Sequence, residues 1–178
     1  IIRNWINSES NLKNIIEIGS GTGSLIEQIG IKEITAVELS STARKELINK
    51  GINTHTTFDE LTTKTSDLIF GNEILDNIPC SIGLYKDEIW YEKVVLLEEA
   101  SLAYDLKPMR NLELDWVNKN NIVPNEDYEF EIQVNIDKFL NSVIKKINPG
   151  KILLFDYGYE QQNRDKRVYS SLLRTYKN

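Results

Sequence analysis

The residues most suited to chemistry lie near the start of the chain, where Glu17 is followed by a loop with glycines at alternate positions: Gly19, Gly21 and Gly23. Glycine permits positive φ and close backbone approach, so the N–H groups of such a loop can face a ligand. A dinucleotide site prefers the spacing G-x-G-x-x-G, but Ser24 stands where its third glycine would be. The loop therefore indicates a nucleotide-type cofactor other than a dinucleotide, with an ordinary glycine-rich turn as the alternative.

A carboxylate at the end of a strand suits a cofactor that carries an amino-acid ammonium, as S-adenosylmethionine does, and Glu17 stands at that point. A second acid, Glu38, ends the apolar run 34–37 about 20 residues after the first glycine, where folds of this kind place the acceptor for both ribose hydroxyls. Phe58 follows the third expected strand, where related folds contact adenine. We therefore expect S-adenosyl-L-methionine as the cofactor. The expected binding residues are Glu17, Gly19, Ser20, Gly21, Gly23, Glu38, Leu39, Phe58 and Asn72.

The elements that must position these residues follow a β-α alternation. Strands are expected at 12–18, 34–39, 52–56 and 67–70, and helices at 1–7, 24–29 and 42–50. Near-continuous apolar strands of this kind predict a parallel sheet covered on both faces. The fold class is therefore α/β, with a Rossmann-like sheet.

The pattern changes after the fourth strand. From Cys80 to Tyr104 the residues alternate and favour β structure, with Lys86–Glu88 as a hairpin turn, so we expect an antiparallel insertion over about 80–125 between the fourth and fifth sheet strands. The remaining expected elements are helices at 112–121 and 136–147, the second closed by Pro149–Gly150, and strands at 151–157 and 167–176. The whole chain, 1–178, is expected to form one domain with this insertion.

A second polar group follows the fourth strand, where ligands of open parallel sheets bind. Asn72, Glu73 and Asp76 offer amide and carboxylate acceptors that can orient the N–H groups of a methyl acceptor and take up its proton, so they are the candidate catalytic residues. The alternative is a capped turn in which Asn72 and Asp76 bind backbone N–H groups and Glu73 lies in solvent. For Asp156 and Tyr157, at the end of the fifth strand, we leave open whether they line the cleft or cap the neighbouring turn.

Four segments occur together in one order: 17–23, 37–44, Asn72–Pro79 and Leu154–Tyr159. In this order the chain resembles the MidA family of S-adenosylmethionine-dependent methyltransferases, which includes a mitochondrial protein arginine methyltransferase needed for complex I assembly. The resemblance runs from about residue 13 to 176 and extends to Leu173–Tyr176, which is similar to the family's late L-R-x-Y strand. Family members usually have about twice this length, so the chain is either a compact relative or incomplete at both ends.

The resemblance implies a class I methyltransferase sheet, cofactor held by the glycine loop and Glu38, and a protein arginine acceptor near Asn72, Glu73 and Asp76. We therefore expect an N-methyltransferase that acts on arginine of a protein. The alternative is an assembly or scaffold protein that keeps the cofactor pocket without methylating anything. A nicotinamide-dependent oxidoreductase is disfavoured by the glycine spacing.

Composition limits the partners. The net charge is −6, and no basic face with interleaved aromatics is evident, so nucleic acid is a disfavoured substrate. One cysteine, Cys80, and one histidine, His55, cannot build a disulfide framework or a Cys/His zinc site, so we expect no metal. No apolar run is long enough to span a membrane. We expect a cytoplasmic protein, with the mitochondrial matrix as the alternative because Ile1 is not Met and a targeting segment could precede it.

The partners of the insertion are also open. A free two-stranded hairpin is barely stable in water, so its apolar face should contact the domain's own helices, a twin subunit in a homodimer, or the substrate protein. Because the insertion begins directly after Asn72–Pro79, we expect it to form one wall of the acceptor cleft.

Overall fold

The structure is a computed structural model that describes residues 2–9, 12–31, 33–61 and 66–157. Its described residues fall into two compact units. We call them the sheet unit, within residues 1–77 and 138–157, and the insertion unit, within residues 78–137. The expected strand at 167–176, the L-R-x-Y segment and Tyr159 lie outside the described residues.

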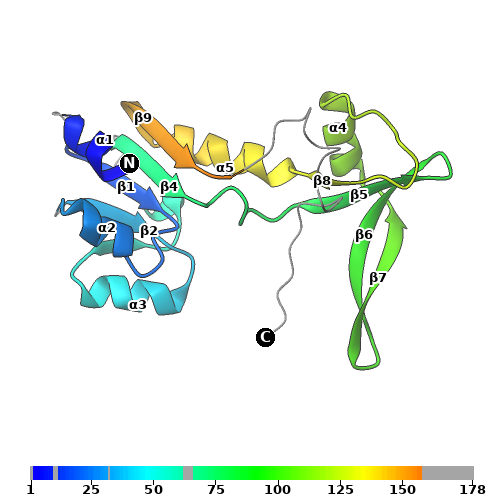
Figure 1. Cartoon of the computed structure of the whole chain (residues 1–178), viewed down its shortest axis with the longest axis horizontal. Coiled ribbons are helices and arrows are strands. Elements are labelled where there is room, and N and C mark those ends of the chain that lie inside the picture. The colour runs from blue at the N-terminus through cyan, green and yellow to red at the C-terminus, as the bar shows by residue number, and fades with distance from the viewer. Residues whose placement is uncertain (1, 10–11, 32, 62–65, 158–178) are drawn as a thin grey trace. The chain divides into compact units, whose positions relative to one another are not determined.

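The sheet unit contains five parallel strands in the order β3-β2-β1-β4-β9 (Figure 1). The strands are β1 (Ile15–Ile18), β2 (Ile34–Val37), β3 (Asn53–His55), β4 (Ser66–Asn72) and β9 (Ile147–Phe155). The central strand has the register that the site needs, because Ile18 at its carboxyl end pairs with Val37 of β2 and Gly71 of β4. The segments that follow these three strands therefore begin at one edge of the sheet.

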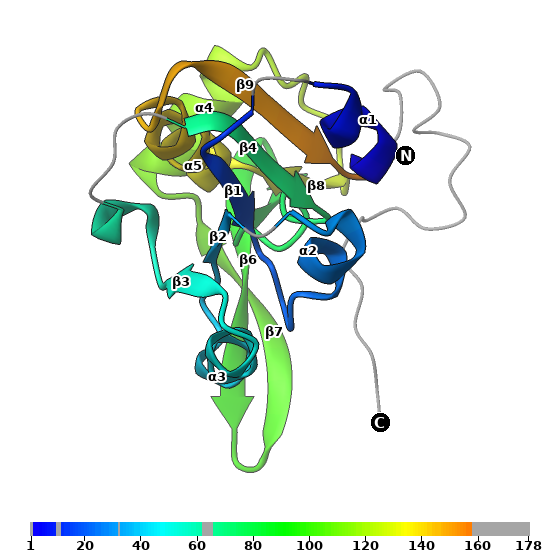
Figure 2. The same cartoon turned by 90° about the vertical axis from the view of Figure 1, so that its left-hand side faces the viewer.

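Helices cover both faces of this sheet, as Figure 2 shows with α1 and α2 on one side and α5 on the other. The helices and the 3₁₀ turn of the unit are α1 (Ile2–Ser8), α2 (Ser24–Ile29), α3 (Ser41–Asn49), η1 (Phe58–Glu60) and, from Lys138 onward, α5 (Val134–Ile144). One core contains Ile6, Ile26, Ile29 and Leu47 of the first three helices, packed on Ile15, Ile34, Ala36, Leu68 and Phe70. The other core joins Phe58 of η1 and Val143 of α5 to Ile16, Ile18, Val37, Leu61 and Ile69. The alternation of neighbours such as Ile15 and Ile16 between the two cores is the period-2 geometry of a strand buried on both faces.

The insertion unit is a four-stranded antiparallel sheet in the order β7-β6-β5-β8 with one helix, α4. Its elements are β5 (Ser81–Lys86), β6 (Ile89–Glu98), β7 (Ser101–Pro108), α4 (Asn111–Lys119) and β8 (Glu129–Ile132). The predicted hairpin turn is confirmed, because Asp87 and Glu88 have φ of 51° and 64° between β5 and β6. Positive φ at both central residues is typical of a type I′ hairpin turn.

Beyond β5, strands β6 and β7 continue as a two-stranded arm, which Figure 1 shows extending past the rest of the insertion sheet. Val94–Glu98 of β6 pair with β7 alone, whereas Ile89–Lys93 pair with β5, and of these only Tyr91–Lys93 also pair with β7. Four large apolar side chains of the arm are exposed: Val95, Leu97, Leu102 and Tyr104. Val95 is opposite Tyr104, and Leu97 is opposite Leu102, so all four share one face of the arm.

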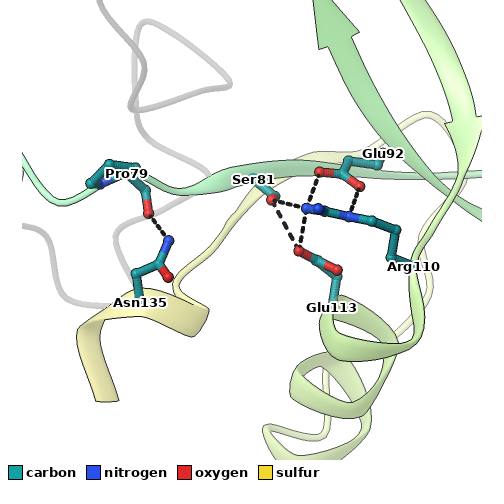
Figure 3. A network of polar contacts seen from close by, with 6 residues as sticks. All are labelled: Pro79, Ser81, Glu92, Arg110, Glu113 and Asn135. Carbon is teal, nitrogen blue, oxygen red and sulfur yellow. Dashed lines mark hydrogen bonds and ion pairs between the residues drawn. The ribbon is translucent and has the colours of Figure 1, made fainter. Parts of the chain in front are cut away.

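A polar network fixes the start of α4 against the insertion sheet (Figure 3). Arg110 donates to both carboxylate oxygens of Glu92 at 3.0 and 2.9 Å, and to Glu113, which is 1% exposed. The bidentate geometry with Glu92 is the strong form of an arginine–carboxylate pair. In the same view Asn135 donates to the carbonyl of Pro79 at 2.8 Å and so ties the start of α5 to the segment before β5.

The structure confirms the predicted α/β class, the parallel sheet and the antiparallel insertion between its fourth and fifth strands, but three details were wrong. The first strand begins at Ile15 rather than at residue 12. The helix expected to reach 147 ends at Ile144, and Pro149–Gly150 lies inside β9, where the register shifts between Ile147 and Lys151. Such an irregularity is one of the few places in a sheet that accept proline. Strand β8 was not predicted at all.

Candidate functional site

The glycine loop between β1 and α2 has the backbone that its sequence requires. Gly19, Gly21 and Gly23 have φ of 65°, 52° and 85°, a region that residues with a Cβ rarely enter. The Gly19 amide donates to the carbonyl of Val37 at 2.8 Å, and the Gly23 amide donates to the backbone carbonyl of Ser20 at 2.9 Å. The loop is therefore fixed to the end of β2 at its first glycine and closed on itself at its last.

Glu38 directly follows β2 and connects it to the glycine loop. Its carboxylate accepts from the Gly21 amide at 2.9 Å and from the Ser40 amide at 2.7 Å, one bond to each oxygen. Arg44 donates to the backbone carbonyl of Glu38 at 2.8 Å. A carboxylate oxygen can accept more than one hydrogen bond, so Glu38 is held in position and keeps acceptor capacity for hydroxyl groups.

Glu17 is a buried acid with an unsatisfied oxygen. It lies in β1, is 3% exposed, and its Oε2 atom has no hydrogen-bond partner among the described residues. Burial raises the pKa of Glu17 from its ordinary 4.5 to about 7. The nearby Ser20 hydroxyl partly opposes this rise, and the charge of Glu38 adds to it. An unpaired carboxylate in such a place is costly, so the site fits a ligand that brings a cation or a donor. The residues present thus fit the ammonium of S-adenosylmethionine.

The other expected cofactor residues differ in their surroundings. Ser20 is buried and donates to the backbone carbonyl of Glu17 at 3.1 Å. Leu39 is 77% exposed, whereas Phe58 is 7% exposed and packs in the core with Val37 and Ile69. Their contacts with adenine or ribose remain predictions.

The segment after β4 is a tight turn that packs on the glycine loop. A Cβ built on Gly19 would lie 2.7 Å from Cδ1 of Ile74, so any larger residue here would require Ile74 to shift. Glu73 has φ of 52°, and its amide donates to the carbonyl of Phe155 at 2.7 Å. Ile74 was not among the residues predicted to form the site, although it stands between the candidate residues Glu73 and Asp76. The turn that carries these two acids therefore contacts the glycine loop through Ile74.

The side chains of the three candidate catalytic residues are used differently. Asp76 accepts from Asn77 at 2.8 Å on Oδ1 and from the Tyr157 hydroxyl at 2.7 Å on Oδ2. Asn72 and Glu73 are exposed, and their side chains form no hydrogen bond with the other described residues. The capped-turn alternative is thus correct for Glu73, which is exposed. The side chain that caps the turn, however, comes from a residue outside the turn.

That residue is Asp156, directly after β9. Its Oδ2 accepts from the amides of Leu75 at 2.7 Å and Asp76 at 3.3 Å, and its Oδ1 accepts from the Tyr157 amide at 2.9 Å. Of the two interpretations left open for Asp156, capping the neighbouring turn is the one that the structure supports. All of these groups belong to the sheet unit.

Other kinds of site are less well supported. The described residues contain no group of three His, Cys, Asp or Glu side chains that could hold a metal ion. No helix in the described ranges is long and apolar enough to cross a membrane. A depression of about 320 Å³ lies at the opposite end of the sheet, lined by the starts of β1, β2 and β3, and so it is not part of the site at the glycine loop.

Comparison with known proteins agrees with this geometry. A family model described as "Putative S-adenosyl-L-methionine-dependent methyltransferase" matches residues 1–178. No curated protein matches the sequence. A crystal structure from Burkholderia thailandensis, described as a "likely methyl transferase" bound to S-adenosyl-homocysteine, is 19% identical with a TM-score of 0.71, over 94% of this chain and 47% of that one.

A native crystal structure from the same organism gives the same identity and TM-score over 94% of this chain and 49% of that one. The chain thus spans about half the length of these two structures. At this identity the likeness shows the fold alone.

Proposed function

The chain belongs to this family of S-adenosyl-L-methionine-dependent methyltransferases, and on that premise we propose that it transfers a methyl group to nitrogen of a protein side chain, with arginine as the acceptor. We take residues 1–178 to form one methyltransferase-like domain, with the insertion expected at about 80–125 extended to residue 137 because β8 pairs with β5. The MidA assignment, which the sequence motifs suggested, is part of the same proposal.

When bound, S-adenosylmethionine supplies a methyl group on a positively charged sulfur. The chain's own residues then have separate tasks. Glu17 would pair with the ammonium, since it is a buried carboxylate with an unsatisfied oxygen. Glu38 would accept from the ribose hydroxyls with the lone pairs that the Gly21 and Ser40 amides leave free.

One observation carries the acceptor half of the proposal: the turn 72–77 lies against the glycine loop through Ile74 and Gly19. Glu73 and Asp76 stand on either side of Ile74 in this turn, so we assign their carboxylates to the edge of the sheet where the cofactor would bind. Two acids and the amide of Asn72 suit a guanidinium, which has five N–H donors and a positive charge. Their role would be to orient the acceptor nitrogen and to receive its proton, which needs modest acid-base power when the groups are well aligned.

The arm of the insertion unit favours a protein as the acceptor. Its exposed face consists of four large apolar side chains, Val95, Leu97, Leu102 and Tyr104, and contiguous exposed apolar side chains of this kind mark interaction surfaces. Such a face suits a macromolecular partner, and we propose the substrate protein. A second copy of this chain in a homodimer is the competing occupant.

Methyl transfer from S-adenosylmethionine labelled in its methyl group tests the proposal. Three peptides of one sequence, with arginine, lysine or citrulline at the central position, serve as acceptors. We expect label in the arginine peptide, none in the citrulline peptide, and loss of labelling in Glu73→Gln. Binding of S-adenosylhomocysteine without transfer to any protein or peptide would favour the scaffold alternative, and NADH binding without S-adenosylhomocysteine binding would overturn the cofactor assignment.

A further inference from the structure

The end of β9 supplies two side chains that organise the proposed acceptor turn from a distance of about 80 positions in the sequence. We propose that Asp156 and Tyr157 are positioning residues of the acceptor site, Asp156 by fixing the backbone of the turn and Tyr157 by fixing the carboxylate of Asp76. This inference rests on the proposed function, because it gives these residues a task in presenting the methyl acceptor.

Asp156 acts on the backbone. The turn after β4 begins with a left-handed residue, Glu73. Because β4 ends at Asn72, the amides that follow Glu73 cannot form hydrogen bonds within the sheet. The amides of Leu75 and Asp76 donate to one oxygen of Asp156, at 2.7 and 3.3 Å. A charged acceptor for two successive amides is a strong local constraint, so Asp156 determines the path of the chain on which Asp76 stands.

Tyr157 acts on a side chain. Its hydroxyl donates to Oδ2 of Asp76 at 2.7 Å, while Asn77 donates to Oδ1 at 2.8 Å. Asn77 is itself fixed by a bond of 2.9 Å to the carbonyl of Glu73. Both oxygens of Asp76 are therefore engaged, and its carboxylate has one orientation instead of several exposed rotamers.

These contacts give the two acids, Glu73 and Asp76, different roles. Glu73 makes no side-chain hydrogen bond with the other described residues, so it can turn toward an acceptor, whereas Asp76 is a fixed reference charge. A guanidinium that binds between them would meet one oriented and one adaptable carboxylate. Orientation of this kind contributes to turnover rather than to cofactor affinity.

The test is a double-mutant cycle with Tyr157→Phe and Asp76→Asn in the full chain, measured as labelled methyl transfer to the arginine peptide. We expect Tyr157→Phe to lower kcat about tenfold with S-adenosylhomocysteine affinity unchanged within about twofold, as expected for a hydrogen bond to a charged group that acts on the acceptor only. In the Asp76→Asn background the same change should have almost no further effect, because its partner is already altered. Tyr91→Phe, which removes a hydroxyl from β6, is the matched control.

A readout independent of turnover accompanies the cycle. The carboxyl ¹³C resonance of Asp76, identified by its loss in Asp76→Asn, should shift in Tyr157→Phe and not in Tyr91→Phe. For the backbone contact, Asp156→Asn should retain more activity than Asp156→Ala, because a carboxamide oxygen still accepts from the two amides.

The outcomes separate the two proposals. An unshifted Asp76 resonance, or additive effects in the cycle, overturns the positioning role while the proposed function stands. A wild-type protein that binds S-adenosylhomocysteine yet methylates none of the peptides overturns the proposed function, and this inference with it.

Discussion

The carboxylate of Glu38 accepts a hydrogen bond from the Gly21 amide at 2.9 Å, which connects the acid after β2 to the middle of the glycine loop after β1. These two features are 17 residues apart in sequence and were identified separately, one by its glycine spacing and the other by its place after an apolar run. Their contact means that the loop and the acid form one preorganised surface. The acid stabilises the loop before any cofactor binds.

This contact sets the expected effect of Glu38→Ala. The variant should weaken S-adenosylhomocysteine binding by roughly 1 to 3 kcal/mol, because ribose hydroxyls lose a charged acceptor and the loop loses its anchor. Isothermal titration calorimetry measures this directly. Glu46→Ala, which removes an exposed acid from α3, is the control and should bind as the wild type does. Equal affinities of the two variants would show that Glu38 is not the ribose ligand.

Local sequence signals predicted the part of the fold that positions the cofactor. The glycine pattern and the apolar runs predicted β1, α2, β2 and α3 to within a few residues. The ends of α3, for example, depend on the cap at Ser40 and the left-handed Gly51, which are determined by neighbouring residues in the sequence. The same signals failed at Pro149–Gly150, which lies in an irregular stretch of β9 where pairing with β4 outweighs the local preference to end a helix.

Contacts over long sequence separations were beyond such reasoning. The bond between Tyr157 and Asp76 spans 81 positions, and that between Asp156 and Leu75 also spans 81. In the sequence, the members of each pair follow two strands of one sheet, which predicts that they lie near each other. It does not predict which side chain caps which amide. Burial of Glu17 could be anticipated from its apolar neighbours, but its unsatisfied oxygen could not.

Glu17 predicts a pH dependence of folding stability. Its folded pKa of about 7 lies above its ordinary value of 4.5, so the native state holds this proton more tightly than the unfolded chain does. The free energy of unfolding should therefore fall as pH rises from 4.5 to 7 and then level off, by roughly 3 kcal/mol in total from this group. Urea titrations from pH 5 to 8 measure this slope.

Glu17→Gln should flatten that slope and make the apoprotein more stable than the wild type at pH 8, while Glu33→Gln, an exposed acid in the same unit, should leave both unchanged. The gain would reflect removal of a buried charge that has no partner without ligand. A Glu17→Gln variant that is less stable at pH 8 would mean that the carboxylate is already satisfied in the apoprotein.

The same group predicts how cofactor binding responds to pH. A cationic ammonium favours the ionised form of Glu17, so S-adenosylhomocysteine affinity should decrease as pH falls below about 7 and the acid becomes protonated. Calorimetry in buffers of different ionisation enthalpy should detect release of a proton on binding at pH 6.5. In Glu17→Gln the proton release should disappear and the affinity should be low at every pH, whereas an unchanged pH dependence would assign the titration to another group.

Alanine substitutions at two glycines of the loop can distinguish the cost of backbone strain from the cost of steric overlap. Gly19 and Gly21 both have positive φ, but a Cβ on Gly19 would lie 2.7 Å from Ile74, whereas one on Gly21 would meet nothing within 4 Å. Gly21→Ala should cost about 1 to 2 kcal/mol of stability from strain alone. Gly19→Ala should cost more, displace the turn 72–77 and lower methyl transfer; Gly19→Ala combined with Ile74→Ala should recover part of the loss. Equal losses in the two single variants would indicate that Ile74 moves aside freely.

The arm of the insertion unit gives the prediction that addresses the substrate. Leu97 and Leu102 are 74% and 76% exposed and lie opposite each other, so replacing both with serine should leave the unfolding midpoint nearly unchanged. If the arm contacts the substrate protein, the KM for that protein should rise about a hundredfold or more, because each of the two buried leucines contributes roughly 1.5 to 3 kcal/mol. The KM for a short arginine peptide, which lacks the protein surface that would contact the arm, should stay the same. Val123→Ser, at a position 78% exposed outside the arm, is the matched control. A change of the double variant from dimer to monomer in sedimentation, with both KM values unchanged, would assign the arm to a second copy of the chain instead.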